Sequence, residues 1–127
     1  MDHKVAFVFP GQGSQVVGML SEFAATRASV LDTFAEASAV LGYDLWQLVQ
    51  NGPEAQLNQT EFTQPALLAA SIALWRLARE DGIAEPAMLA GHSLGEYSAL
   101  VAAGVIDFAD GIKLVQLRGQ FMQTAVP

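Results

Sequence analysis

The chain has 127 residues, a length typical of one domain or of part of one. Thirteen acidic and six basic residues give a net charge of −7, which argues against a nucleic-acid partner because such proteins present a basic face. There is no cysteine, and the only histidines are His3 and His92. This excludes disulfides, a cysteine nucleophile and the usual Cys- or His-based metal centres, and we expect no cofactor or metal.

The longest uninterrupted apolar stretch, Ala99–Ile106, has eight residues, far fewer than the roughly 20 that span a membrane. The apolar run Val5–Phe9 is too short for a secretory signal. We therefore expect a cytoplasmic protein without a membrane partner. Only 15% of the residues are charged, against roughly 25% in an average domain, and 52% are hydrophobic. Some apolar faces are therefore expected to contact further polypeptide.

The first expected element is a strand, Lys4–Phe9, which is β-branched, aromatic and almost continuously apolar. This pattern predicts a buried strand of a parallel sheet, covered on both faces. The glycine-rich turn Gly11–Gln15 follows, and then a short amphipathic segment from about Val16 to Ala25.

Helices dominate the next part of the chain. Ser29, with Asp32 three residues later, resembles a capping box at the start of a helix that ends at Gly42. Asp44 is expected to cap a short helix that ends before Gly52-Pro53. The remaining expected elements are a long apolar helix Ala66–Glu80 opened by Thr63-Gln64-Pro65, a strand Ala87–Ala90, a turn Gly91–Gly95, a helix Glu96–Ala103, and a helix from Asp107 to about Gln123.

Strand, helices, strand and helix in this order are typical of an α/β crossover unit. Only two strands are predicted, and a two-stranded sheet is marginally stable by itself. We therefore expect the other strands of the sheet to lie beyond Pro127.

The most specific motif is Gly91-His92-Ser93-Leu94-Gly95, a G-x-S-x-G between a predicted strand and a predicted helix. This is the context of a nucleophile elbow, in which glycines permit a tight turn that exposes the serine hydroxyl. The following helix directs its N-terminal N–H groups toward the same place. A structural alternative is a glycine-rich turn with a capping serine, but the context favours Ser93 as a nucleophile.

The loop Gly11–Gln15 is a second candidate. A dinucleotide fingerprint fails because Val16 stands where its third glycine belongs, and a P-loop fails because no Gly-Lys-Ser/Thr follows. If the two strands are parallel neighbours, both loops emerge at one sheet edge. The N–H groups of Gln12 and Leu94 could then form an oxyanion hole, although an ordinary βα turn is the alternative.

Arg118 lies in the middle of the apolar arc of the last helix, with Leu114, Val115, Phe121 and Met122 three or four residues away. A cation on a buried face is costly unless an anion pairs with it. Periodicity slightly favours a structural salt bridge or a side chain that reaches water. The functional alternative is a guanidinium that binds a substrate carboxylate in a bidentate fork.

A serine nucleophile also needs a base within hydrogen-bonding reach. Side chains of adjacent residues diverge at a sharp turn, so His92 is a poor candidate, and packing or backbone hydrogen bonding is its expected role. His3 lies at the opposite end of the first strand. Either the enzyme is unusual, or its base lies in sequence that is not present here.

Four motifs in order resemble the malonyl-CoA:acyl-carrier-protein transacylases of bacterial fatty-acid synthesis and, more distantly, the acyltransferase domains of polyketide synthases. They are Phe9-Pro10-Gly11-Gln12-Gly13-Ser14-Gln15, Thr63-Gln64-Pro65-Ala66, the run from Gly91 to Leu100, and Arg118-Gly119. The resemblance implies malonyl-CoA and acyl carrier protein as partners, and a malonyl-Ser93 intermediate. It also implies that Gln12 and Leu94 hold the oxyanion, that Arg118 binds the malonyl carboxylate, and that Gln64 lines the same pocket.

Such enzymes also have a catalytic histidine and a small ferredoxin-like subdomain in their C-terminal half, and neither is in this chain. Residues 1–127 therefore resemble the incomplete, helix-rich N-terminal portion of an α/β-hydrolase-like acyltransferase core. We expect this portion to be nearly inactive alone and prone to associate. The alternatives are an α/β-hydrolase-type thioesterase or esterase, and a non-catalytic remnant that acts as a binding module.

Overall fold

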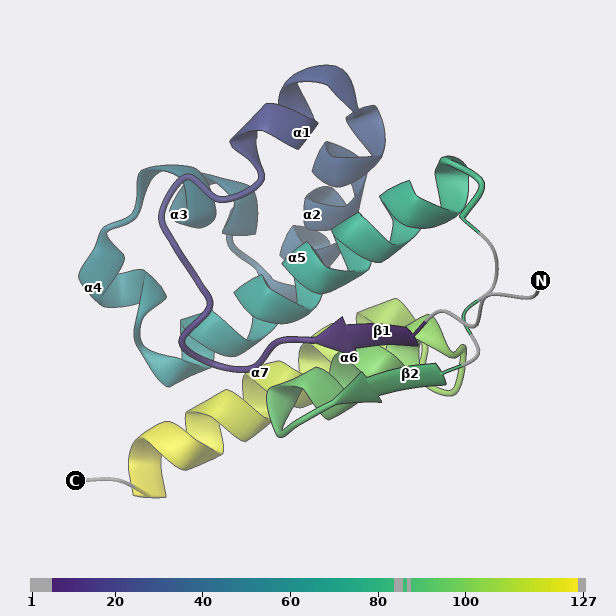
Figure 1. Cartoon of the computed structure of the whole chain (residues 1–127). Helices are drawn as coiled ribbons and strands as arrows, with labels where there is room; N and C mark the ends of the chain where they lie inside the picture. Colours follow the sequence, from purple (N-terminus) through teal and green to yellow (C-terminus); the bar gives the residue numbers. More distant parts are fainter. Residues whose placement is uncertain (1–5, 84–85, 87, 126–127) are drawn as a thin grey trace.

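The computed structural model describes residues 6–83, 86 and 88–125. Within this part of the chain a two-stranded sheet packs among helices (Figure 1). The elements are β1 (Ala6–Phe9), α1 (Ser21–Thr26), α2 (Ala28–Leu41), α3 (Leu45–Asn51), α4 (Glu54–Leu57), α5 (Thr60–Glu80), β2 (Met88–Gly91), α6 (Leu94–Ala102) and α7 (Phe108–Ala125). The expected α/β class with a short parallel sheet is confirmed.

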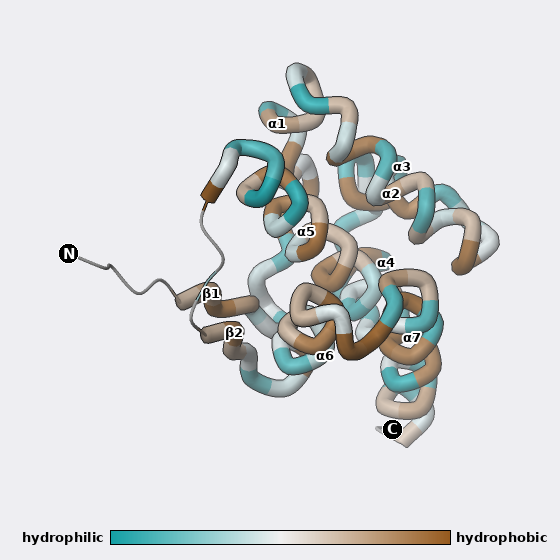
Figure 2. Tube along the Cα trace, turned by 90° about the vertical axis from the view of Figure 1, so that its right-hand side faces the viewer, coloured by the Kyte–Doolittle hydropathy of each residue, from teal (hydrophilic) through white to brown (hydrophobic). Residues whose placement is uncertain are grey.

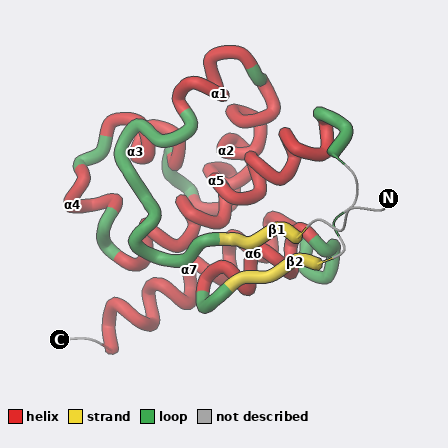
Figure 3. Tube along the Cα trace, viewed as in Figure 1, coloured by secondary structure: helices red, strands yellow, loops and turns green. Residues whose placement is uncertain are grey.

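The two strands pair in parallel, with Ala6 opposite Met88 and Phe9 opposite Gly91. Their carboxyl ends therefore lie side by side, and the loops that follow them leave the same edge of the sheet. Figure 3 shows the loop after β1 passing the N-terminal end of α5 before it turns back to α1. The turn after β2 leads directly into α6.

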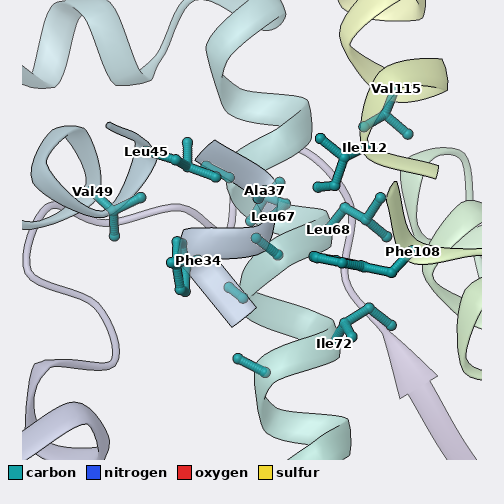
Figure 4. Close-up of a cluster of buried hydrophobic side chains, with 14 of the residues drawn as sticks. Phe34, Ala37, Leu45, Val49, Leu67, Leu68, Ile72, Phe108, Ile112 and Val115 are labelled. Carbon is teal, nitrogen blue, oxygen red and sulfur yellow. The ribbon is translucent and has the colours of Figure 1, made fainter. Parts of the chain in front are cut away.

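Helix α5 forms the centre of the fold, as its apolar circumference predicts. Figure 4 shows Phe34 and Ala37 of α2 on one side of α5, and Phe108 and Ile112 of α7 on the other. All four side chains are buried, and every residue of α5 from Thr63 to Ala73 is buried as well. A helix covered on all sides in this way can hold loops at both of its ends in fixed positions.

The start of α5 was predicted wrongly. The helix begins at Thr60 rather than Ala66, so Pro65 lies inside it. Because proline is typical of the first turn of a helix, Pro65 made the predicted start too late. The missing N–H of Pro65 removes only the bond to the Glu61 carbonyl, while the Thr63 hydroxyl donates to the carbonyls of Leu57 and Gln59.

The capping box at Ser29 is also wrong. Helix α2 begins at Ala28, so its N-cap is Arg27, two residues before Ser29, and the Arg27 side chain makes no cap hydrogen bond. The Ser29 hydroxyl instead donates to Glu80 Oε2 at 3.2 Å, at the far end of α5. Two other expectations are confirmed, because Gly42 ends α2 in the left-handed conformation and the Asp44 carboxylate accepts from Gln47 N at 3.0 Å.

The strands are not covered on both faces, contrary to the prediction. Side chains alternate between the faces of a strand, and in β1 Phe9 is 6% exposed whereas Val8 is 75% exposed. Met88 of β2 is 61% exposed on the adjacent strand. Figure 2 shows that both strands are mostly hydrophobic. Lys4, Val5 and Ala87, which the prediction included in the strands, lie outside the described residues.

None of the helices in the described part of the chain is long and apolar enough to cross a membrane.

Candidate active site

Ser93 lies between the end of β2 and the first residue of α6. Its backbone has φ 56° and ψ −117°, and among the described residues Leu20 is the only other non-glycine residue with positive φ. Such conformations are uncommon for residues with a side chain and gather at functional sites. Ser93 is exposed while Leu94 and Gly95 behind it are buried, which is the arrangement expected of a nucleophile elbow.

The two glycines of the motif leave no room for a side chain. A β-carbon on Gly91 would overlap the carbonyl group of Gly95, and a β-carbon on Gly95 would overlap the Phe9 carbonyl oxygen. The second contact also joins the elbow to the end of β1. A side chain at position 95 would therefore push the two strand ends apart.

The loop after β1 is held beside this elbow by amide side chains. A β-carbon on Gly11 would be 3.3 Å from the His92 carbonyl oxygen, so the two loops are adjacent. Gln12 Nε2 donates to Thr60 Oγ1 at 3.1 Å, and Gln15 Nε2 donates to Asn58 Oδ1 at 3.0 Å. Thr60 is the first residue of α5 and Asn58 lies in the connection between α4 and α5, so these bonds anchor the loop beside the start of the central helix.

The expected oxyanion donors are the N–H groups of Gln12, in the loop after β1, and of Leu94, the first residue of α6. In α6 the N–H of Gly95 donates to the His92 carbonyl at 3.0 Å, and the N–H of Glu96 donates to the Ser93 carbonyl at 3.0 Å. Leu94, the first residue of the helix, has no carbonyl to bond within it. The pairing of the Leu94 and Gln12 N–H groups around one oxygen stays a prediction.

Arg118 reaches Ser93 from α7. Its Nη2 donates to Ser93 Oγ at 3.0 Å, and its Nη1 donates to Gln64 Oε1 at 2.9 Å. None of the ion pairs between described residues includes Arg118, so the salt bridge that periodicity favoured is not found there. The surrounding arc is also less buried than expected: Val115 is covered, whereas Leu114, Phe121 and Met122 are 41%, 76% and 37% exposed.

Gln64 is fully buried and supports the guanidinium from α5. Its Oε1 accepts from Arg118, and its Nε2 points at the sulfur of Met122 at 3.2 Å. The crossing of α5 and α7 is close here, because a β-carbon on Gly119 would be 2.8 Å from both Glu61 Cα and the Thr60 carbonyl oxygen. The backbones of the two helices thus set the position of Arg118 relative to Gln64.

Among the hydrogen bonds between described residues, none involves the ring of His92. His92 is exposed, which contradicts a packing role for its ring, although its backbone carbonyl does accept the bond from Gly95. The hydrogen bond to Ser93 Oγ that the structure contains comes from Arg118. His3 lies outside the described residues.

Sequence reasoning missed Tyr97 as part of this site. The Arg118 Cζ lies 5.4 Å from the centroid of the Tyr97 ring. Tyr97 follows Ser93 by four residues, which is one turn of α6, and that spacing could have indicated a shared face. Nothing in the spacing indicated that Arg118 would lie there as well.

The arrangement is therefore an exposed serine at a strained turn with a guanidinium in hydrogen-bonding contact. A family model described as acyl transferase domain matches residues 6–127. Among curated relatives, the malonyl CoA-acyl carrier protein transacylase of Salmonella typhimurium is 67% identical over 122 residues, covering 96% of this chain and 40% of the relative. The protein of the same name from Bacillus subtilis is 48% identical over 124 residues, covering 98% and 39%.

Solved structures give the same result. A Vibrio cholerae acyl carrier protein S-malonyltransferase superposes with a TM-score of 0.96 at 69% identity, over 98% of this chain and 41% of that protein. A malonyl-transacylase in complex with a type II polyketide-synthase acyl-carrier protein has a TM-score of 0.96 at 64% identity, over 98% and 40%. The chain thus spans about two-fifths of the length of the relatives it matches. The match to the family model covers nearly the whole chain, and this protein belongs to the acyl transferase domain family.

Proposed function

We propose that this chain supplies the nucleophile and the acyl-selecting residues of a malonyltransferase, which moves a malonyl group from malonyl-CoA to the phosphopantetheine thiol of an acyl carrier protein in fatty-acid biosynthesis. The observation that carries the proposal is the contact of Arg118 Nη2 with Ser93 Oγ at 3.0 Å. A cation beside the nucleophile favours an acyl group that ends in a carboxylate, as a malonyl group does.

In the first half-reaction, Ser93 Oγ attacks the thioester carbonyl carbon of malonyl-CoA. A base takes the hydroxyl proton, and we assign this role to a histidine outside this chain, as the family resemblance implies. The negative charge on the tetrahedral intermediate falls on the former carbonyl oxygen, where the N–H groups of Gln12 and Leu94 would donate to it. The C–S bond then breaks, and coenzyme A leaves as its thiol with the proton from the base.

In the second half-reaction, the carrier-protein thiol attacks the malonyl-serine ester. The thiol proton passes through the base to Ser93 Oγ as the C–O bond breaks, which restores the free serine. Arg118 and Gln64 would hold the malonyl carboxylate through both half-reactions. Neither residue takes part in making or breaking a bond.

The names of the relatives support the substrates. The Salmonella relative is a malonyl CoA-acyl carrier protein transacylase, and another relative was solved in complex with an acyl-carrier protein. We also place the reaction in the cytoplasm, in line with the expectation from the sequence.

The experiment uses a fusion in which this sequence replaces the matching segment of the Vibrio cholerae S-malonyltransferase and is followed by the rest of that protein. The 69% identity and TM-score of 0.96 make the exchange structurally conservative. Incubation with malonyl-CoA should add one malonyl group to Ser93, as measured by intact mass and peptide mapping. Ser93→Ala should abolish the adduct, and Arg118→Ala should remove the preference for malonyl-CoA over acetyl-CoA.

Two outcomes would overturn the proposal. If the adduct forms but passes to water rather than to the carrier-protein thiol, the chain belongs to a thioesterase. If a correctly folded fusion never acquires the adduct, the chain is a binding module. Residues 1–127 alone should show almost no turnover, because we place the base elsewhere.

A further inference from the structure

The aromatic ring of Tyr97 lies against the guanidinium of Arg118. The distance from Arg118 Cζ to the ring centroid is 5.4 Å, within the range of about 6 Å for an energetically significant cation–π contact. Tyr97 is partly buried and packs against the hydrophobic core. The ring therefore has a fixed support on α6, and it belongs to the same helix whose start presents Ser93.

In the described part of the chain, Gln64, Ser93 and Tyr97 interact with the guanidinium, the first two as hydrogen-bond acceptors. Gln64 accepts from Nη1 and Ser93 accepts from Nη2. A guanidinium has five N–H donors in one plane, so these two bonds leave donors available for a further acceptor. Tyr97 contacts the group through its ring and consumes none of the donors.

The choice of an aromatic neighbour has a consequence for charge. A carboxylate would hold Arg118 more tightly, but it would also neutralise the charge that a substrate carboxylate needs. Arg118 forms no ion pair with the residues that the structure describes, which are 6–83, 86 and 88–125. An aromatic ring attracts the cation through its quadrupole and leaves the net charge in place.

We propose that Tyr97 is a positioning residue for Arg118. Its ring fixes the plane of the guanidinium, so that the free N–H donors face the terminal carboxylate of an acyl group on Ser93. The inference rests on the proposed function, because it gives Tyr97 a part in recognising that carboxylate. The ring performs this role and the phenol hydroxyl does not.

The first test compares Tyr97→Phe with Tyr97→Leu in the fusion described above. Tyr97→Phe keeps the ring and should keep the KM for malonyl-CoA within about twofold. Tyr97→Leu keeps an apolar side chain without the ring and should raise that KM by about 3- to 30-fold, the range that cation–π energies correspond to. Transfer from acetyl-CoA, which has no carboxylate to bind, should change far less. Equal effects on the two donors would overturn the assignment.

The second test separates electrostatics from packing and does not depend on the stability of the Leu variant. Phenylalanine carrying one, two or three ring fluorines is incorporated at position 97. Fluorine withdraws electron density from the ring face with little change in shape, so the KM for malonyl-CoA should rise with each fluorine, while the acetyl-CoA reaction shows no trend. A flat series would mean that Tyr97 only fills space.

The results distinguish this inference from the function on which it rests. If the unaltered fusion fails to load malonyl onto Ser93, the proposed function is wrong and the role of Tyr97 falls with it. If the fusion loads Ser93 and Arg118→Ala removes the malonyl preference, but the position-97 variants keep it, only the role of Tyr97 is overturned.

Discussion

Gln64 Oε1 accepts the hydrogen bond that Arg118 Nη1 donates at 2.9 Å, and the Gln64 side chain is completely buried. A buried donor or acceptor without a partner is costly, so this pair constrains both side chains. Because the amide is neutral, it orients the guanidinium without reducing its charge. The contact joins α5 to α7 beside Ser93, the residue before the start of α6.

The first prediction concerns the neutral charge of the Gln64 side chain. Gln64→Glu keeps the shape of the side chain but places a carboxylate on Arg118, where it competes with the substrate carboxylate. In the fusion, we expect the KM for malonyl-CoA to rise by at least about tenfold, equivalent to about 1.4 kcal/mol. Gln120→Glu, which adds the same charge at an exposed position of α7, is the matched control. An unchanged KM in Gln64→Glu would show that Arg118 does not bind the substrate.

The second prediction concerns the contact between the elbow and β1. The β-carbon of Gly95→Ala would overlap the Phe9 carbonyl oxygen, so we expect the free energy of unfolding in urea to fall by about 2–4 kcal/mol. Gly104→Ala is the matched control, because Gly104 has φ 79° but nothing within 4 Å of an added β-carbon. The control should lose only about 1–2 kcal/mol, the cost of a left-handed alanine. Equal losses would mean that the elbow adjusts without strain.

The third prediction is a pH dependence that comes from Tyr43. Burial, and to a smaller extent the charge of Glu61, raise the pKa of Tyr43 from 10.0 to about 12. The unfolded state therefore releases this proton first. The contribution to stability is fully present below pH 10 and is lost as the pH rises toward 12, at up to about 1.4 kcal/mol per pH unit.

Tyr43→Phe isolates this effect. The Tyr43 hydroxyl is buried and has no hydrogen-bond partner among the residues that the structure describes, so its removal should leave the stability at pH 7 unchanged or slightly higher. Urea unfolding of the fusion between pH 9 and about pH 12 should show a steeper loss for the parent protein than for Tyr43→Phe. Parallel curves would contradict the assignment.

The fourth prediction concerns an exposed apolar strip on α7, formed by Leu114, Leu117 and Phe121, which are 41%, 51% and 76% exposed. Spacings of three and four residues place them on one helix face. Residues 1–127 alone should therefore self-associate as concentration rises, as measured by light scattering after gel filtration. The double variant Leu117→Gln/Phe121→Gln should reduce the association, whereas Val105→Gln, at an exposed position outside the strip, should not. A chain that stays monomeric at high concentration would contradict the prediction.

Much of the site could be predicted from the sequence, because it depends on local geometry. A serine between two glycines, after a strand and before a helix, has few conformations available, and the structure contains the expected turn at Ser93. Parallel pairing of the strands then places the loop that contains Gln12 at the same edge.

The parts that sequence could not predict depend on contacts between distant residues. Ser29 looked like a helix cap, but the carboxylate of Glu80, 51 residues away, takes its hydrogen bond. Helical periodicity placed Arg118 on an apolar arc, yet its partners Gln64 and Ser93 are 54 and 25 residues away in sequence. The exposure of Val8 depends on what packs on the sheet, and an apolar strand sequence carries no information about that.

If the proposed function is right, the glycine next to Arg118 limits how the preference for acyl groups can change. At Gly119 the main chains of α5 and α7 approach so closely that an added β-carbon would be 2.8 Å from Glu61 Cα. A larger residue at position 119 would push α7, and with it the Arg118 guanidinium, away from α5. On the proposed function, longer or branched acyl groups would then have to be accommodated by side chains around the acyl group, because the close helix crossing at Gly119 constrains the position of Arg118 relative to Ser93.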